Sequence, residues 1–412
     1  MPVPYLPVEL IKLIVADPIL AKVDLQSLNL TARLFPPLVR PHLFRRLEIP
    51  MAWISKDYEP ERTFEQRSAS TLAEMERLMA FRLHPDLAAL VKAVSIHRQY
   101  DGPGMEPPPR SIRTTAFDFM QLVYTVFPRI EEATSFSVHP IIAPPRLPLP
   151  CCQTLRTLRG LVLDVHAWNN LQTCTALREL RLEEISFQGG VPAVPPSLLP
   201  FRLETLEIGC SLEVNLTNLF LKPFLRACGP TLKHLWLGMD YNDVPDLSML
   251  PRLASLGIEM MANDWNGDLS ESLEAWLETA LPTCTTLERL TLKATEDGER
   301  LRKTPQGLLA VPRVAAVLPK TLTSIDFDML PDEGELEAVL NNNKSVQVIG
   351  MPRQVRSDPA DARAPFVDFP LACADGRLPV ARLLPSTWYQ GGPIGLGVAS
   401  LRMECALFRF AL

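Results

Sequence analysis

Hydrophobic residues recur along the chain in a short phrase of six positions. The phrase is clear at Leu177, Leu180 and Leu182, where two polar residues and then one polar residue separate the leucines. It opens at 158/161/163, returns at 203/206/208, 232/235/237, 253/256/258, 287/290/292 and 322/325/327, and closes at 346/349/351. The last two apolar positions alternate with period two, so they point to one face of a strand. Such a face is buried only when copies stack, which predicts a continuous series of strands.

The segments between the phrases have helical spacing. Residues 216–228 carry apolar side chains three and four positions apart, and residues 270–281 place Leu273, Leu277 and Leu281 on one face. Consecutive parallel strands need a crossover, which a helix provides. The sequence therefore predicts an α/β fold, with a parallel sheet on a concave face and helices outside.

The repeated phrase resembles the leucine-rich repeat family over residues 155–351. Cys174 and Cys284 lie three residues before the first leucine of their units, and Cys228 lies four before. A metal cluster is one interpretation of these cysteines. Equivalent positions without any C-x-x-C spacing favour the other, small buried residues at helix-to-strand turns. We expect no metal and no cofactor.

Composition limits the classes of partner. The chain has 412 residues, a net charge of −6, a pI of about 5.7 and no long basic run, which argues against nucleic acid. No apolar run approaches the roughly 20 residues of a membrane span. Eight cysteines without paired spacing are typical of reduced thiols, so we expect a cytoplasmic or nuclear protein with no membrane partner.

The first fifty residues predict three short helices. Leu10, Leu13 and Ile14 form one helical face, Asp24 is a candidate N-cap for a second helix, and a third helix contains Val39. So few residues bury little core unaided. A module of this size usually packs on a neighbour or a partner.

These helices resemble the F-box family over residues 4–47, most closely the F-box proteins with degenerate repeats that are abundant in fungi. The matching pattern is Leu-Pro-x-Glu-Leu, a later Ile, Asp-Leu-x-x-Leu, Arg-x-aromatic and Leu-Phe. These positions are Leu6, Pro7, Glu9, Leu10, Ile14, Asp24, Leu25, Leu28, Arg33, Phe35, Leu43 and Phe44. The family binds a Skp-type adaptor, and through it a cullin. The resemblance thus implies adaptor contacts by Leu6, Pro7, Glu9, Leu10, Ile14, Leu25 and Leu28.

Two other interpretations of the helices and the tail remain open. The apolar helix residues could instead form a cap that shields the end of the repeats. Residues 48–154 are interpreted as degenerate early repeats with connector helices. Residues 352–412 lack either period and are expected to be irregular, either a peptide that docks elsewhere or a spurious translated end.

The variable positions of each phrase are predicted to line the concave face in rows. One row contains Arg181, Glu207 and Trp236, and the others contain the remaining candidates for substrate contacts: His234, Glu259, Arg289 and Lys293. Trp236 is interpreted either as an exposed aromatic anchor or as a residue covered by a loop on a solvated polar face.

No catalytic motif accompanies these rows. The six histidines lack H-x-x-H spacing, and neither a G-x-S-x-G nor a GK[ST] motif occurs, so no enzyme is predicted. The sequence predicts the substrate-recognition subunit of an SCF-type (adaptor–cullin–F-box) ubiquitin ligase, with an unknown protein substrate. The alternative is an interaction scaffold outside any ligase.

Overall fold

The structure is a computed structural model of the whole chain. It describes residues 8–17, 20, 22–31, 35–51, 77–98, 122–136, 150–185, 187, 191–192, 199–209, 217–239, 245–260, 269–294, 312–327, 333–351 and 380–383. Among the described residues, no helix is long and apolar enough to cross a membrane.

A single sheet runs through the molecule. In the described part of the chain, twelve strands lie side by side in sequence order, and every neighbouring pair is parallel. They are β1 (Arg46–Met51), β2 (Ala93–Arg98), β3 (Glu132–Phe136), β4 (Thr157–Leu163), β5 (Glu179–Ile185), β6 (Thr205–Ile208), β7 (His234–Met239), β8 (Ser255–Met260), β9 (Arg289–Ala294), β10 (Ser324–Phe327), β11 (Val348–Met351) and β12 (Val380–Leu383). The predicted α/β class with a parallel sheet is confirmed.

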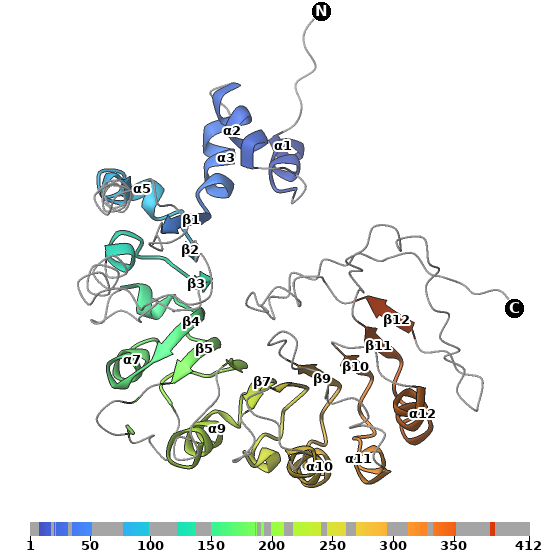
Figure 1. Cartoon of the computed structure of the whole chain (residues 1–412). Helices are drawn as coiled ribbons and strands as arrows, with labels where there is room; N and C mark the ends of the chain where they lie inside the picture. Colours follow the sequence, from blue (N-terminus) through green and yellow to red (C-terminus); the bar gives the residue numbers. More distant parts are fainter. Residues whose placement is uncertain are drawn as a thin grey trace, which may run out of the picture.

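The helices after β1 lie on the outer side of an arc, and the strands lie on its inner side (Figure 1). They are α5 (Pro85–Ala88), α7 (Val165–Leu171), α9 (Lys222–Cys228), α10 (Leu269–Ala280), α11 (Pro312–Ala316) and α12 (Glu333–Asn342). Short helical turns precede or extend some of them: η1 (Pro150–Gln153), η2 (Thr217–Leu221), η3 (Leu247–Met249) and η4 (Leu281–Thr283). One face of the sheet is therefore covered by helices, and the other is concave.

The core is a column of aliphatic side chains on the helix-covered face. Leu180, Leu206 and Leu235 are direct neighbours across the strands, and each is almost completely buried. The column continues in both directions through Leu158, Leu256, Leu290, Ile325 and Ile349. Each buried leucine stabilises the fold by about 1.5–3 kcal/mol, so the repeated phrase holds the strands in register.

A bulge in β4 shifts the first repeat. Leu158 pairs with Leu180, which is the second apolar position of its phrase, so Leu155 takes the first position and not Leu158. The register slips after Arg159, where Gly160 adopts a φ of 79°. Glycine reaches this left-handed conformation without steric cost, which permits the inserted residue.

The sheet also extends beyond the clear repeats. In β3, Ala133 pairs with both Val94 and Leu158, so this strand joins the sheet and contributes a small core residue. In the predicted tail, β12 pairs with β11 over Val348–Met351. The expectation of a wholly irregular segment after residue 351 thus missed a strand.

The first three helices form a module with its own core. They are α1 (Val8–Val15), α2 (Lys22–Thr31) and α3 (Phe35–Leu43), and α3 packs against both others. Ile11, Val15, Leu25 and Val39 are buried together, separately from the core of the sheet. Asp24 lies inside the first turn of α2, so the prediction that it is the N-cap was wrong.

The repeat cysteines occupy buried positions at the predicted turns. Cys174 follows α7, Cys228 ends α9 and Cys284 follows η4, and all three are buried free thiols. The Sγ atom of Cys284 lies 3.5 Å from the carbonyl oxygen of Ala280. Burial raises the pKa of Cys284 to about 11 and raises that of Cys228 further. The interpretation as small buried residues is confirmed.

Gly229→Ala tests the close approach of α9 to the next turn. Gly229 has helical angles, φ −47° and ψ −42°, at which a Gly to Ala change normally stabilises by about 0.4–1 kcal/mol. Here an added Cβ would lie 2.2 Å from the carbonyl oxygen of Met249. We expect a loss of about 1–3 kcal/mol in urea unfolding, because backbone must move. An unchanged or higher midpoint would contradict this packing.

Candidate interaction surfaces

The first candidate surface is an apolar face on α1. Leu10 is 45% exposed, Ile14 is 49% exposed, and Val8 and Leu13 are exposed beside them. Leu10 and Ile14 are four residues apart and therefore share one side of the helix. The adjacent side of the helix carries Ile11 and Val15, which are buried in the module's core. Helix α1 is thus apolar on both sides, and one side is open.

The residues expected to contact an adaptor divide into three groups. Leu10, Ile14 and the polar Glu9 are exposed on α1. Leu25 is buried in the module's core and Leu28 is half-buried against it, so both hold the helices together. A direct contact of Leu25 with an adaptor would need the helices to move apart, and the adaptor contacts of these residues stay predictions. Leu6 and Pro7 lie outside the described residues.

The second candidate surface is the concave face of the sheet, where the predicted rows are confirmed by the register. Arg181 pairs with Glu207, and Glu207 pairs with Trp236. This central row continues through Gly257, Thr291 and Asp326. A second row contains Glu179, Thr205, His234, Ser255, Arg289 and Ser324. Glu259 pairs with Lys293 in a third row, although the side chain of Lys293 lies outside the described part.

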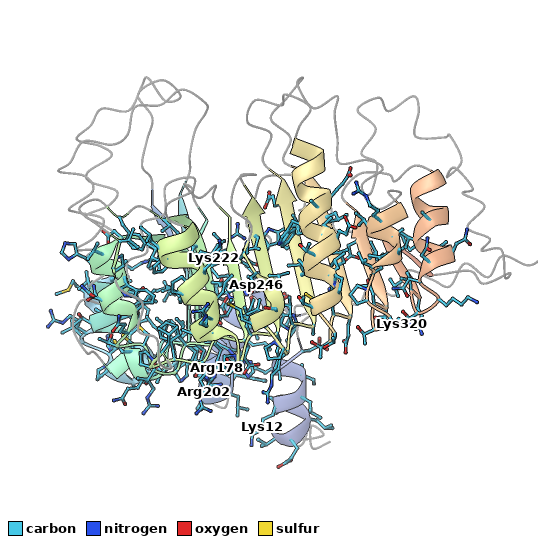
Figure 2. All side chains as sticks on the ribbon, turned by 90° about the horizontal axis from the view of Figure 1, so that it is seen from below. Lys12, Arg178, Arg202, Lys222, Asp246 and Lys320 are labelled. Carbon is cyan, nitrogen blue, oxygen red and sulfur yellow. The ribbon has the colours of Figure 1, made fainter. Side chains whose placement is uncertain are left out.

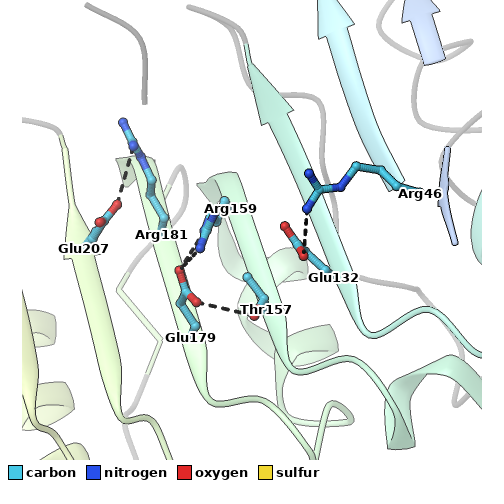
Figure 3. A network of polar contacts seen from close by, with 7 residues as sticks. All are labelled: Arg46, Glu132, Thr157, Arg159, Glu179, Arg181 and Glu207. Carbon is cyan, nitrogen blue, oxygen red and sulfur yellow. Dashed lines mark hydrogen bonds and ion pairs between the residues drawn. The ribbon is translucent and has the colours of Figure 1, made fainter. Parts of the chain in front are cut away.

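Arginine and glutamate side chains on this face bind one another across strands (Figure 3). Arg181 lies 3.5 Å from Glu207, and the Glu207 side chain is only 5% exposed. In the neighbouring strands, Arg159 donates from Nε to Oε1 of Glu179 at 2.6 Å, and Thr157 donates to the other oxygen of Glu179 at 3.4 Å. Such partly buried pairs fix the side chains more firmly than exposed ones. The face is therefore a preorganised polar network.

Trp236 lies flat on the sheet and does not project from it. Its side chain is 5% exposed, so the interpretation as an exposed anchor was wrong. A Cβ built on Gly257 would fall 2.0 Å from its Cε3 atom, which shows that the indole covers Gly257 in the next strand. Its Nε1 donates to Oε2 of Glu259 at 3.1 Å. The residue opposite Trp236 must be glycine for this arrangement.

Burial changes the acidity of two groups on the concave face. Asp326 has a fully buried side chain, and burial raises its pKa although Arg289 donates to it at 2.7 Å. Burial also lowers the pKa of His234, and the nearby charges of Lys233 and Arg289 lower it further. Near neutral pH, His234 is therefore a neutral polar group, two residues before Trp236 in the same strand.

The pairing partners were the part of this surface that the sequence reasoning missed. Glu179 and Asp326 were not among the predicted contact residues, although their carboxylates form ion pairs with Arg159 and Arg289. Opposite charges in neighbouring rows could have indicated them. In the part of the chain that the structure describes, no group of three or more His, Cys, Asp or Glu side chains is arranged to hold a metal ion.

Comparisons with known proteins do not assign the chain to a family. A scan against protein-family models finds no match to the chain, and a search of curated proteins finds no matching relative.

The substitution Gly257→Ala tests whether the indole of Trp236 packs on Gly257. We expect a loss of about 1–3 kcal/mol in unfolding free energy, because the new methyl group displaces the indole and breaks its bond to Glu259. The control is the same change in a Trp236→Ala background. There the penalty should disappear, giving a coupling energy of at least about 1 kcal/mol. Equal penalties in both backgrounds would show that the ring lies elsewhere.

His234 gives a testable pH dependence. Its pKa is lowered in the folded chain, so the unfolded chain binds its proton more tightly. The contribution of neutral His234 to the free energy of unfolding is fully present above about pH 6.5, the ordinary pKa of histidine. It falls as the pH drops below this value toward the lower pKa of His234 in the folded chain. Thermal melts of the wild type and of a His234→Gln variant between about pH 7.5 and pH 5 measure this. The difference between them should change across that window, and a constant difference would contradict the assignment.

Proposed function

We propose that this chain is the substrate-recognition subunit of an SCF-type ubiquitin ligase. Helices α1–α3 act as an F-box-like module that docks a Skp-type adaptor and, through it, a cullin. The strands and helices after β1 form a leucine-rich-repeat solenoid, whose concave face holds a protein substrate. The chain itself makes no bond in this scheme, because it acts by bringing a substrate close to the ubiquitin-loaded partner.

One observation carries the proposal: α1 presents Leu10 and Ile14 to solvent from within the motif that resembles an F-box. Exposed large apolar side chains that share one helical side favour a partner surface. Each could contribute about 1.5–3 kcal/mol if a partner buried it completely. Leu25 and Val39 meanwhile keep the helices together, so the exposed side does not depend on the partner for its shape.

The separate core of the module disfavours the interpretation as a cap. A cap would share its buried residues with the first strands, whereas Ile11, Val15 and Val39 form a cluster apart from the sheet core. The described ring contact between the two parts joins Phe44, just after α3, to Phe81 at a centroid distance of 6.2 Å. An interaction scaffold outside any ligase remains the alternative, and adaptor binding separates the two.

The concave face supports substrate recognition by preorganisation. Arg181 and Arg289 are held by Glu207 and Asp326, so binding a substrate would cost little additional side-chain entropy. His234 provides a neutral hydrogen-bonding group between these pairs. This surface suits a polar segment of a protein better than a reaction centre.

A pull-down with purified Skp-type adaptor tests the proposal. The intact chain should retain the adaptor, and a Leu10→Asp/Ile14→Asp variant should lose it, because two charges replace the apolar contacts. Both side chains are about half exposed, so the variant should keep its thermal midpoint.

The matched control is Leu83→Asp/Leu219→Asp, which changes two exposed leucines outside the module, at 80% and 60% exposure. This variant should bind as the intact chain does. Failure of the intact chain to bind, or equal binding by the α1 variant, would leave the scaffold as the better account.

A further inference from the structure

The residues that immediately precede the strands stack into a second column, at the edge of the sheet where the strands begin. The backbone N–H of Lys92 donates to the carbonyl of Arg45 at 2.9 Å, and each following unit repeats this bond. From β1 to β7 the column reads Arg45, Lys92, Glu131, Arg156, Arg178, Glu204 and Lys233. Because the backbone bonds fix these positions, their side chains lie one strand spacing apart.

Basic residues occur at this edge in every strand from β1 to β8. Where the column holds Glu131 or Glu204, an arginine lies two residues earlier, at Arg129 and Arg202. In β8, where the column holds Ala254, Arg252 occupies the same earlier position. We call this set the basic strip: Arg45, Lys92, Arg129, Arg156, Arg178, Arg202, Lys233 and Arg252. Figure 2 shows Arg178 and Arg202 at the end of the sheet where the strands begin.

The two glutamates of the column are neutralised within it. Lys92 lies 2.9 Å from Glu131, and Lys233 lies 2.7 Å from Glu204. These contacts lower the pKa of both carboxyl groups, so both stay charged and paired. The positive charge that remains on the strip therefore belongs to its arginines.

Most of these arginines are exposed and make no ion pair. Among the described residues, the guanidinium groups of Arg45, Arg129, Arg156, Arg202 and Arg252 have no hydrogen bond or ion pair, and all five are exposed. Arg178 donates only to a carbonyl oxygen, that of Arg202 at 3.1 Å. A chain with a net charge of −6 thus places more basic than acidic side chains along one edge of its described part.

We propose that the basic strip binds an extended acidic segment of a partner protein. Seven strand spacings of about 4.8 Å give a length of roughly 34 Å, which about ten extended residues can span. Arginine binds carboxylates through two parallel hydrogen bonds, so a row of exposed guanidinium groups suits a run of Asp and Glu side chains. This proposal is independent of the adaptor surface, since it requires no residue of α1–α3.

A nucleic acid is the competing polyanion, and the composition of the strip disfavours it. Single-stranded nucleic acids bind basic grooves in which aromatic side chains stack on the bases. The large hydrophobic side chains that stand exposed in the described part of the chain are aliphatic ones and a methionine, with no aromatic ring.

Fluorescence anisotropy with a labelled peptide of about ten glutamates tests the proposal on the full chain. The wild type should bind it, and raising the salt from about 0.1 M to about 1 M should abolish binding, since the screening length falls from roughly 10 Å to roughly 3 Å. The variant Arg156→Glu/Arg178→Glu/Arg202→Glu should bind about tenfold more weakly or worse. Its thermal midpoint shows whether it remains folded.

Two control variants and one competitor complete the design. Lys222→Glu/Arg226→Glu/Arg313→Glu makes the same change of charge on α9 and α11, and Leu10→Asp/Ile14→Asp alters α1. Both should bind the peptide as the wild type does. Equal losses in both triple variants, or no binding by the wild type, would overturn the proposal. Tighter, strip-dependent binding of a single-stranded oligonucleotide of equal charge would assign the strip to nucleic acid instead.

Discussion

The fold depends on one constraint, the stacking in register of the inner apolar residues of each strand. Leu180, Leu206 and Leu235 leave water by contact with the equivalent residue of the next strand and with the helices that cover this face. The constraint acts only between neighbours, so return segments of different length are tolerated as long as each strand keeps its place. The polar rows of the concave face and the column of the basic strip follow from this same register. The polar residues of each row lie side by side because the leucines of the same strands are aligned.

Much of this arrangement could be predicted from the sequence. The period-two alternation of Leu206 and Ile208 correctly predicted which residues face the core, and aligning the phrases correctly paired Arg181 with Glu207. The prediction was wrong by three positions in the first repeat, because the glycine bulge at Gly160 makes Leu161 resemble the second position of the phrase. The inserted residue lengthens the spacing from Leu158 to Leu161 to three positions, which is the spacing of the first two positions of the phrase, so spacing alone does not detect the bulge.

The functional surfaces were less predictable than the strands. When a helix has apolar residues on two sides, the sequence does not predict which side is buried. The packing of the three helices shows that Ile11 is buried and Leu10 is exposed. The residue type of Trp236 suggested an exposed anchor as one interpretation, whereas its exposure depends on Gly257 in the adjacent strand. The burial of a residue on the concave face depends on the size of the residue beside it in the next strand. The register predicts which residue that neighbour is, but the exposure of the side chain is known only from the side-chain geometry.

The helical module and the sheet have separate cores, and the module presents an open apolar surface. Native-state hydrogen exchange read by mass spectrometry tests this separation most directly, because each core should open with its own free energy. We expect amides of α1–α3 to exchange together and well before those of β4–β9, with no change in the sheet when the module opens. Exchange of both parts in a single step, with one common opening free energy, would contradict it.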